Sequence, residues 1–225
     1  MNRQQFDKMM EQYMDMAKYE NIQVYPCLND DTTKTSFEPH YFYQGIWAGE
    51  KIYQSLIKKH VDVGSEIRWV GSLTVYVNEV TFVDIRPFGT NLNNLKMLKG
   101  NILNLPFENE SLQSISSLSV IEHIGLGRYG DAIDPEGTKK ACKELQRVTM
   151  KNGNIYVSCP IGKEKTCFNA HRIHNPEIIM EYFDECELVE FSVVNDNETF
   201  IKNVNMKNYM NNNYACGMFW LKKKK

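Results

Sequence analysis

The residues that could do chemistry lie where short apolar runs of the sequence end. The run His60–Val63 contains Asp62 and is followed directly by Gly64 and Ser65. A glycine turn at the end of a strand lets backbone N–H groups approach a ligand there. An ordinary strand-to-helix loop is the alternative, because Glu66 stands where ligand-binding turns often have a second glycine.

A carboxylate ends the next apolar run. Asp84, followed by Ile85, lies twenty positions after Gly64. An acid at this point can accept hydrogen bonds from both ribose hydroxyls of an adenosine-containing ligand. A helix cap is the alternative interpretation of an acid after a strand, but the spacing from the glycine turn favours ribose binding.

Further polar residues follow the third and fourth apolar runs. Asn101 and Ile102 could bind an adenine ring, which needs one polar side chain at its exocyclic amine and flat apolar packing around it. A plain turn is the alternative here. Ser119 ends the fourth run, at the edge where ligands bind in doubly wound sheets. The residues predicted to bind the cofactor are therefore Asp62, Gly64, Ser65, Asp84, Ile85, Asn101, Ile102 and Ser119.

Two histidines are candidates for a catalytic base. His123 lies just beyond the fourth run, and His171 follows the fifth. The unperturbed pKa of histidine is about 6.5, so the ring can accept a proton at neutral pH. For His123 the alternative is a supporting role in which the ring holds the loop.

The segment 125–137 is too long and too polar for a mere connection between a strand and a helix, so we expect it to face a substrate. The guanidinium of Arg172 could pair with a phosphate or carboxylate. The predicted substrate-binding residues are Arg128, Tyr129, Asp131, Asp134 and Arg172. A solvated loop, and simple packing before the next helix, are the alternatives. Two acids three positions apart are common in turns, so no metal site is predicted.

These residues need a sheet that brings the ends of several strands together. After residue 58, short apolar runs alternate with helical ones, which is typical of βαβ units and a mostly parallel sheet. The Asn-rich sequence between the last two runs favours an antiparallel pair at one edge. The predicted strands are His60–Val63, Val80–Ile85, Lys96–Gly100, Leu112–Leu118, Asn154–Cys159, Glu187–Val194 and Ala215–Leu221.

The first quarter of the chain is predicted to be helical. Apolar residues at helical spacing indicate an amphipathic helix over residues 3–19, and a second helix is expected over Tyr43–Lys58. We therefore predict one domain over residues 1–225, with a helical cap region (1–58) and a Rossmann-like α/β core (59–225). The core sheet is expected to have seven strands and an antiparallel C-terminal edge.

The composition is that of an ordinary globular chain, with 42% apolar and 24% charged residues among 225. A net charge of −2 argues against a nucleic-acid partner, which would require phosphate neutralisation. No apolar stretch is long enough for a membrane span, and the polar start predicts a cytoplasmic protein. Six cysteines without a CxxC pair predict neither a zinc site nor a disulfide framework. The chain could also form a homodimer.

Two segments of the chain carry a family resemblance. They are Val120–Ile124, with the sequence VIEHI, and Gly153–Pro160, with the sequence GNIYVSCP. The helical stretch Ala141–Val148 lies between them. Both resemble the class I S-adenosylmethionine (SAM)-dependent methyltransferases, particularly the methyltransferase type 11 group. The likeness extends from about His60 to Pro160.

A closer likeness covers most of the chain. The segments that carry it are Tyr41–Ala48, Asp62–Ser65, Asp84–Pro87, Glu122–Asp131 with Asp134-Pro135, and Phe168–Arg172. They resemble DUF268, a family of methyltransferase-like proteins often found with bacterial surface-glycan genes. The resemblance implies a class I methyltransferase fold and a SAM site, without indicating the acceptor.

Resemblance and residues together predict a SAM-dependent methyltransferase. The polar loop favours O-methylation of a small polar acceptor, such as a sugar, nucleotide-sugar or surface-glycan precursor, with His123 or else His171 taking the proton. The glycine turn contains a single glycine, because no other glycine follows Gly64 before Gly71. This keeps open a SAM-fold binding or regulatory protein with reduced turnover. A nicotinamide enzyme is disfavoured because GxGxxG is absent.

Overall fold

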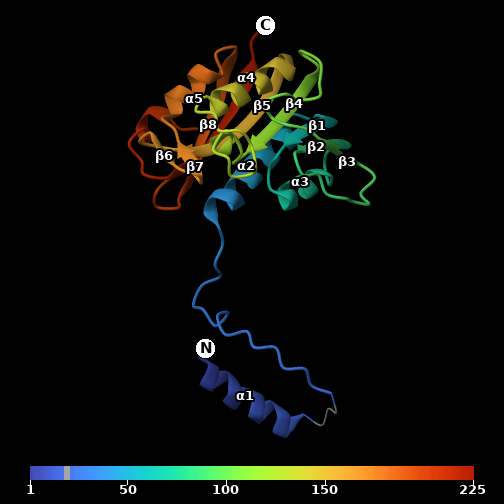
Figure 1. Cartoon of the computed structure of the whole chain (residues 1–225), viewed down its shortest axis with the longest axis vertical. Coiled ribbons are helices and arrows are strands. Elements are labelled where there is room, and N and C mark those ends of the chain that lie inside the picture. Colours follow the sequence, from blue (N-terminus) through green and yellow to red (C-terminus); the bar gives the residue numbers. More distant parts are fainter. Residues whose placement is uncertain (18–20) are drawn as a thin grey trace. The chain divides into compact units, whose positions relative to one another are not determined.

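An eight-stranded sheet organises the chain in the computed structural model, which describes residues 1–17 and 21–225 (Figure 1). Its strand order is β3-β2-β1-β4-β5-β10-β8-β9. Neighbours from β3 to β5 are parallel, whereas β10 is antiparallel to both β5 and β8, and β8 is antiparallel to β9. The carboxyl ends of β3, β2, β1 and β4 therefore meet at one edge of the sheet.

The elements have the following bounds. The strands are β1 (Lys59–Val63), β2 (Glu79–Asp84), β3 (Leu95–Lys99), β4 (Leu112–Leu118), β5 (Thr149–Ile161), β6 (Lys165–Cys167), β7 (His171–Ile173), β8 (Cys186–Val194), β9 (Phe200–Ile201) and β10 (Ala215–Lys223). The helices are α1 (Arg3–Met16), α2 (Pro39–Gln54), α3 (Ile67–Leu73), α4 (Gly137–Val148) and α5 (Pro176–Tyr182). Two short 3₁₀ helices are η1 (Ile121–His123) and η2 (Met206–Tyr209).

The predicted fold class is confirmed, with differences in detail. All seven predicted strands are present, and the last two form the expected antiparallel pair. The two-residue strand β9 adds an eighth strand, too short to give a sequence pattern. A separate hairpin, β6–β7, was also not predicted, and the residue that follows it, His174, pairs with Ile161 at the end of β5.

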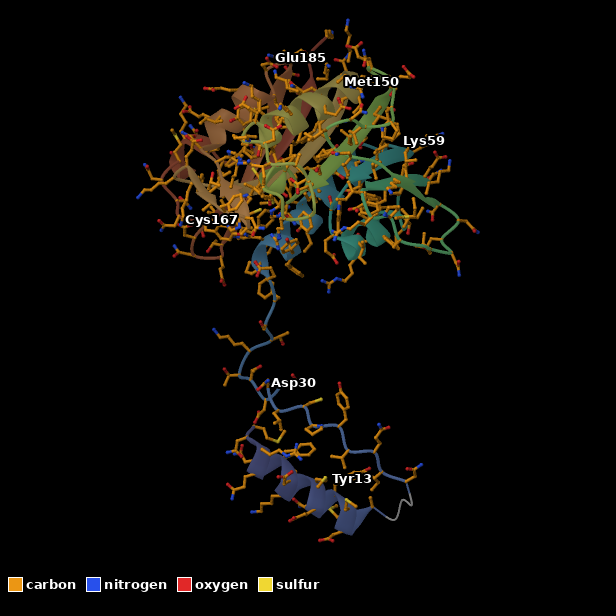
Figure 2. The ribbon with its side chains drawn as sticks, viewed as in Figure 1. Tyr13, Asp30, Lys59, Met150, Cys167 and Glu185 are labelled. Atoms are coloured by element: carbon orange, nitrogen blue, oxygen red, sulfur yellow. The ribbon has the colours of Figure 1, made fainter. Side chains whose placement is uncertain are left out.

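Two helical layers cover the sheet, one on each face. Alternate residues of a strand point to opposite faces. On β5, Ile155 and Val157 accordingly join a core cluster with α4 and α5, whereas Tyr156 joins a second cluster with α2 and α3. The side chains drawn in Figure 2 fill both layers. Lys59 and Met150, labelled there, mark the amino ends of β1 and β5, so the functional residues lie at the opposite edge.

The described chain divides into two units, Met1–Phe37 and Glu38–Lys225. The smaller unit contains α1, which begins at a capping box between Asn2 and Gln5. The helix predicted over residues 3–19 is confirmed through Met16, while positions 18 and 19 lie outside the described residues.

The second predicted helix, α2, is part of the larger unit. It begins at Pro39, four residues earlier than predicted, because proline is well suited to the first turn of a helix. Two contacts fix α2 to β8, since Trp47 Nε1 and Lys51 Nζ donate to opposite oxygens of Glu190 at 3.1 and 2.7 Å. Among the described residues, no helix has the length and apolar character needed to cross a membrane.

Candidate active site

The glycine turn after β1 is shaped for close approach. Gly64 has a positive φ of 72°, and its N–H donates to Val83 O at 2.9 Å. A Cβ at this position would lie only 3.1 Å from Val120 Cγ1. The backbone conformation therefore favours glycine here, and the space for a side chain is tight.

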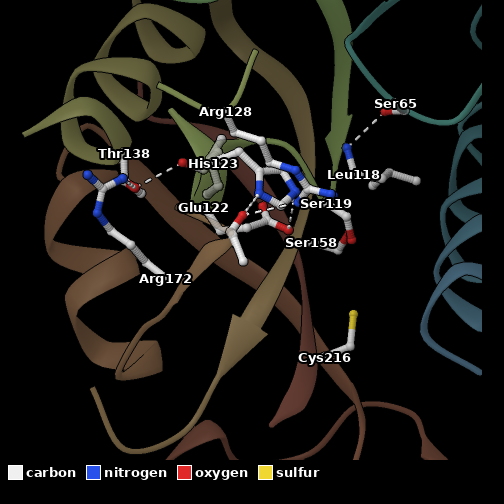
Figure 3. Close-up of polar contacts among 12 residues, drawn as sticks. Ser65, Leu118, Ser119, Glu122, His123, Arg128, Thr138, Ser158, Arg172 and Cys216 are labelled. Carbon is white, nitrogen blue, oxygen red and sulfur yellow. Dashed lines mark hydrogen bonds and ion pairs between the residues drawn. The ribbon is translucent and has the colours of Figure 1, made fainter. Parts of the chain in front are cut away.

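A buried network behind the turn holds it in place. Asp62 is fully buried and accepts hydrogen bonds from Ser65 Oγ at 2.8 Å, Trp69 Nε1 at 3.2 Å and Ser116 Oγ at 2.5 Å. Burial raises the pKa of Asp62 to about 6, against the effect of these bonds. Ser65 Oγ also accepts from Leu118 N at 2.9 Å, which ties the turn to β4 (Figure 3). Asp62 and Ser65, predicted to bind a cofactor, thus lie beneath the turn.

Six predicted cofactor residues line one cavity at the carboxyl edge of the sheet, with a volume of about 350 Å³. We call it the first cavity. These residues follow four neighbouring strands, which explains why they meet. They are Gly64, Asp84, Ile85, Asn101, Ile102 and Ser119.

The polar residues of the first cavity also shape its loops. Asp84 Oδ1 accepts from Arg86 N at 2.6 Å, and Asn101 Oδ1 accepts from Leu103 N at 2.9 Å. Both contacts span two positions, a pattern by which Asp and Asn side chains fix turns. Ile102, which is buried, adds apolar lining to the first cavity.

A second cavity of about 270 Å³ adjoins the first. Its lining residues are Glu38, His40, Tyr41, Ser119, Glu122, His123, Arg128, Pro160, His171, Tyr214 and Cys216. Ser119 and His123 line both cavities. A group bound in one cavity can therefore meet a group bound in the other at these two side chains.

His123 has the geometry of a base. Its Nδ1 lies 2.6 Å from Ala170 O, and because a carbonyl only accepts hydrogen bonds, Nδ1 carries the ring proton. The lone pair is then on Nε2, which lies 3.7 Å from Glu122 Oε1. Burial lowers the pKa of His123, so the ring is neutral at pH 7.

His171, the other predicted base, lines only the second cavity. It extends from β7, and its ring centroid lies 5.0 Å from that of Tyr214. Burial lowers its pKa as well. The structure thus places His171 in a wall of the second cavity and His123 at the junction.

The predicted substrate residues of the loop divide into three groups. Tyr129 and Asp131 line the first cavity, and Arg128 lines the second. Asp131 also shapes the loop, because its carboxylate accepts from Gly125 N at 2.6 Å and Tyr129 N at 3.2 Å. Asp134 lies outside both cavities and pairs with Lys140 at 2.6 Å.

Arg172 is likewise placed outside both cavities. Its terminal nitrogens donate to Ile124 O at 2.6 Å, Asp134 O at 3.0 Å and Thr138 Oγ1 at 3.3 Å. The side chain is buried, and Figure 3 shows it beside Thr138. Its guanidinium therefore holds the loop to the start of α4, where the sequence predicted a phosphate or carboxylate partner.

Sequence reasoning missed Glu122 as a site residue. It is 2% exposed, lines the second cavity, and its Oε2 has no hydrogen-bond partner among the described residues. Burial raises its pKa to about 8. Its position directly before His123 in η1 is the signal that could have identified it. Within the described ranges, 1–17 and 21–225, no group of three potential ligands could hold a metal ion.

The fold is that of class I SAM-dependent methyltransferases. The N-methyltransferase NodS from Bradyrhizobium japonicum WM9, in complex with S-adenosyl-L-homocysteine (SAH), has a TM-score of 0.59 and 12% identity, covering 88% of this chain and 94% of that one. YcgJ from Bacillus subtilis gives 0.53 and 12%, covering 80% and 99%. The [4+2]-cyclase SpnF gives 0.55 and 10%, covering 79% and 82%. At such identities the similarity shows the fold alone.

No curated protein sequence matches the chain. A family model, described as "Caenorhabditis protein of unknown function, DUF268", matches residues 85–223. The matched region covers more than half of the chain, begins directly after β2, and includes η1 and the second-cavity residues from Ser119 to Cys216. The chain therefore belongs to the DUF268 family.

Proposed function

We propose that this protein is a SAM-dependent methyltransferase that O-methylates a small polar acceptor, such as a sugar, nucleotide-sugar or surface-glycan precursor. The observation that carries the proposal is the junction of two cavities at Ser119 and His123. Methyl transfer requires a donor and an acceptor held in line, and two adjoining cavities with a base between them suit that requirement.

The first cavity suits the donor. The Asp84 carboxylate at the end of β2 can accept hydrogen bonds from a ribose diol, and Asn101 and Ile102 offer an amide and an apolar surface to adenine. Gly64 leaves room for the amino-acid end of the molecule to approach the backbone. When bound, SAM supplies a methyl group on a positively charged sulfur, and the carbon–sulfur bond breaks with its electron pair left on sulfur.

His123 supplies the proton acceptor. The contact with Ala170 O fixes the Nδ1 proton, so Nε2 can take the proton of an acceptor hydroxyl. The lowered pKa keeps this nitrogen free at neutral pH. Arg128 Nη1 donates to the same carbonyl at 3.1 Å and supports the segment that orients the ring.

A screen with methyl-labelled SAM tests the proposal. Sugars, nucleotide-sugars and other small hydroxyl compounds are incubated with the full chain, and labelled products are identified by mass spectrometry. We expect label on a hydroxyl oxygen of at least one acceptor. Binding of SAH without transfer to any acceptor would instead support the binding or regulatory alternative, and absence of SAH binding would contradict both.

A further inference from the structure

The second cavity contains a buried carboxyl group with incomplete contacts. Glu122 extends from η1, is 2% exposed, and its Oε2 has no hydrogen-bond partner within the described chain. Buried polar atoms are nearly always hydrogen-bonded, so each exception needs an explanation. Because Glu122 lines a cavity, a ligand bound there can contact its carboxyl group, and a half-turn of that group exchanges its two oxygens.

The distance between Glu122 and His123 is short enough for one ligand atom to contact both. Glu122 Oε1 and His123 Nε2 are 3.7 Å apart. An atom lying about 2.8 Å from each would be at ordinary hydrogen-bond distance from both. Because Nε2 can only accept, that ligand atom must donate a proton to His123.

The charge state of Glu122 decides what the ligand atom must be. Burial raises the pKa of Glu122 to about 8, so at pH 7 the group is a neutral acid that donates one O–H. The ligand atom must then donate to His123, accept from Glu122 and still have a lone pair for the methyl group. A hydroxyl oxygen has two lone pairs and can do all three, whereas an amine nitrogen has only one.

The walls of the second cavity favour a ring-shaped polar ligand. The Tyr214 ring contacts those of His40 and His171, with centroid distances of 5.1 and 5.0 Å. Aromatic faces stack on the apolar side of a sugar ring, while their polar atoms reach its hydroxyls. Glu38 and Arg128 bring opposite formal charges, so the cavity does not require a charged ligand.

We propose that Glu122 binds the acceptor directly and selects a neutral hydroxyl of a small polyol, such as a monosaccharide unit, over an amine in the same position. This inference rests on the function proposed above and names the acceptor class for the same site. In the transfer, the hydroxyl oxygen takes the methyl group, the hydroxyl proton moves to His123 Nε2, and Glu122 keeps its own proton.

Several ionisable groups surround Glu122 and enter its pH dependence. Burial is the main cause of its raised pKa, and Arg128 acts in the opposite direction. The ionisable residues around it are Glu38, His40, Tyr41, His123, Arg128, Cys159, His171, Tyr214 and Cys216. Above pH 8 the carboxyl ionises and loses its O–H, so methylation of a hydroxyl should decline.

The test compares matched acceptors with variants of Glu122. Methyl glucoside, methyl galactoside and the uridine diphosphate forms of glucose and galactose are assayed beside the 2-amino-2-deoxy counterpart of each, with methyl-labelled SAM and the full chain. Glu122→Ala removes the carboxyl, Glu122→Gln keeps its shape and an N–H donor, and Glu181→Gln removes an exposed carboxylate from α5 as a control.

We expect the label on hydroxyl oxygens and none on the amine nitrogen of the amino sugars. Glu122→Ala should raise KM for the hydroxyl acceptor by about tenfold or more, Glu122→Gln should restore part of this loss, and SAH affinity should stay within about twofold in both. Glu122→Gln should also lack the decline in rate above pH 8. The control should match the wild type.

The opposite results would overturn the inference. Methylation of an amine nitrogen, an unchanged KM in Glu122→Ala, or a decline above pH 8 that persists in Glu122→Gln would each exclude Glu122 from acceptor binding. So would failure to bind or methylate any compound of the panel in a protein that binds SAH. Failure to bind SAH at all is distinguishable, because it contradicts the proposed function itself.

Discussion

The two cavities that meet at His123 are built from different kinds of sequence. The first is lined by residues 63–131, which follow the neighbouring strands β1, β2, β3 and β4. The second combines residues from 38–41, 119–128, 160–171 and 214–216, which are far apart in the chain. Only the short segment around η1 contributes to both.

This difference explains why the residues of the first cavity are easier to predict from the sequence than those of the second. Parallel neighbouring strands place the turns that follow them at one edge, so a site built from those turns has a regular spacing in the sequence. A site assembled from the start of α2, a hairpin and the approach to β10 has no such spacing. The donor half of the proposed reaction could therefore be recognised from sequence, and the acceptor half required the folded chain.

The largest expected effect is on the rate of methyl transfer when each candidate base, His123 or His171, is removed. His123→Ala should lower the rate of methyl transfer by about 10²–10⁴-fold, because general base catalysis contributes about that much. His171→Ala should have less than about a tenfold effect, because His171 lines only the second cavity. Steady-state kinetics with a labelled acceptor measures both. Equal effects of the two substitutions would show that the junction at His123 is not the catalytic point.

The buried carboxyl of Glu122, in the second cavity, should make the stability of the protein depend on pH. Its pKa is raised from 4.5 to about 8, so the folded state holds a proton that the unfolded state releases. The free energy of unfolding should therefore fall as the pH rises from 4.5 to 8, by up to about 5 kcal/mol relative to Glu122→Gln.

Urea denaturation at several pH values measures this difference. Wild type and the Glu181→Gln control should lose stability along parallel curves, while Glu122→Gln should lose less over the same range. If all three curves run parallel, Glu122 is not a neutral acid in the folded protein.

The smallest expected effects come from two glycines, Gly64 just before α3 and Gly71 within it. Gly64→Ala should lower the free energy of unfolding by about 1–2 kcal/mol and weaken SAH binding, because the left-handed conformation disfavours a side chain. Gly71, in the interior of α3, has no atom within 4 Å of an added Cβ. Gly71→Ala should raise stability by about 0.5–1 kcal/mol. Shifts in the same direction would contradict the role given to the turn.

The fold could be predicted from the sequence because its strands are separate, apolar and regularly spaced. The exceptions have physical reasons. The strand β9 is two residues long, and the hairpin β6–β7 is formed by short polar segments whose pairing gives no periodicity.

The site could be predicted only in part. Gly64 and Asp84 line the first cavity as expected, because turns after adjacent parallel strands must meet. Asp62 and Arg172 carry the right chemical groups, but those groups are used by Ser65 and by backbone carbonyls, which no linear pattern reveals. The place of Glu122 beside His123 is visible in the sequence, but its burial becomes evident only in the folded chain.

Titration calorimetry with SAH tests the separation of the two cavities most directly. We predict that SAH binds wild type and Glu122→Gln with equal affinity, and binds Asp84→Ala about tenfold or more weakly through loss of charge-assisted contacts to the ribose. Absence of heat with wild type, unchanged affinity in Asp84→Ala, or equal weakening in both variants would contradict the assignment of the first cavity to the donor.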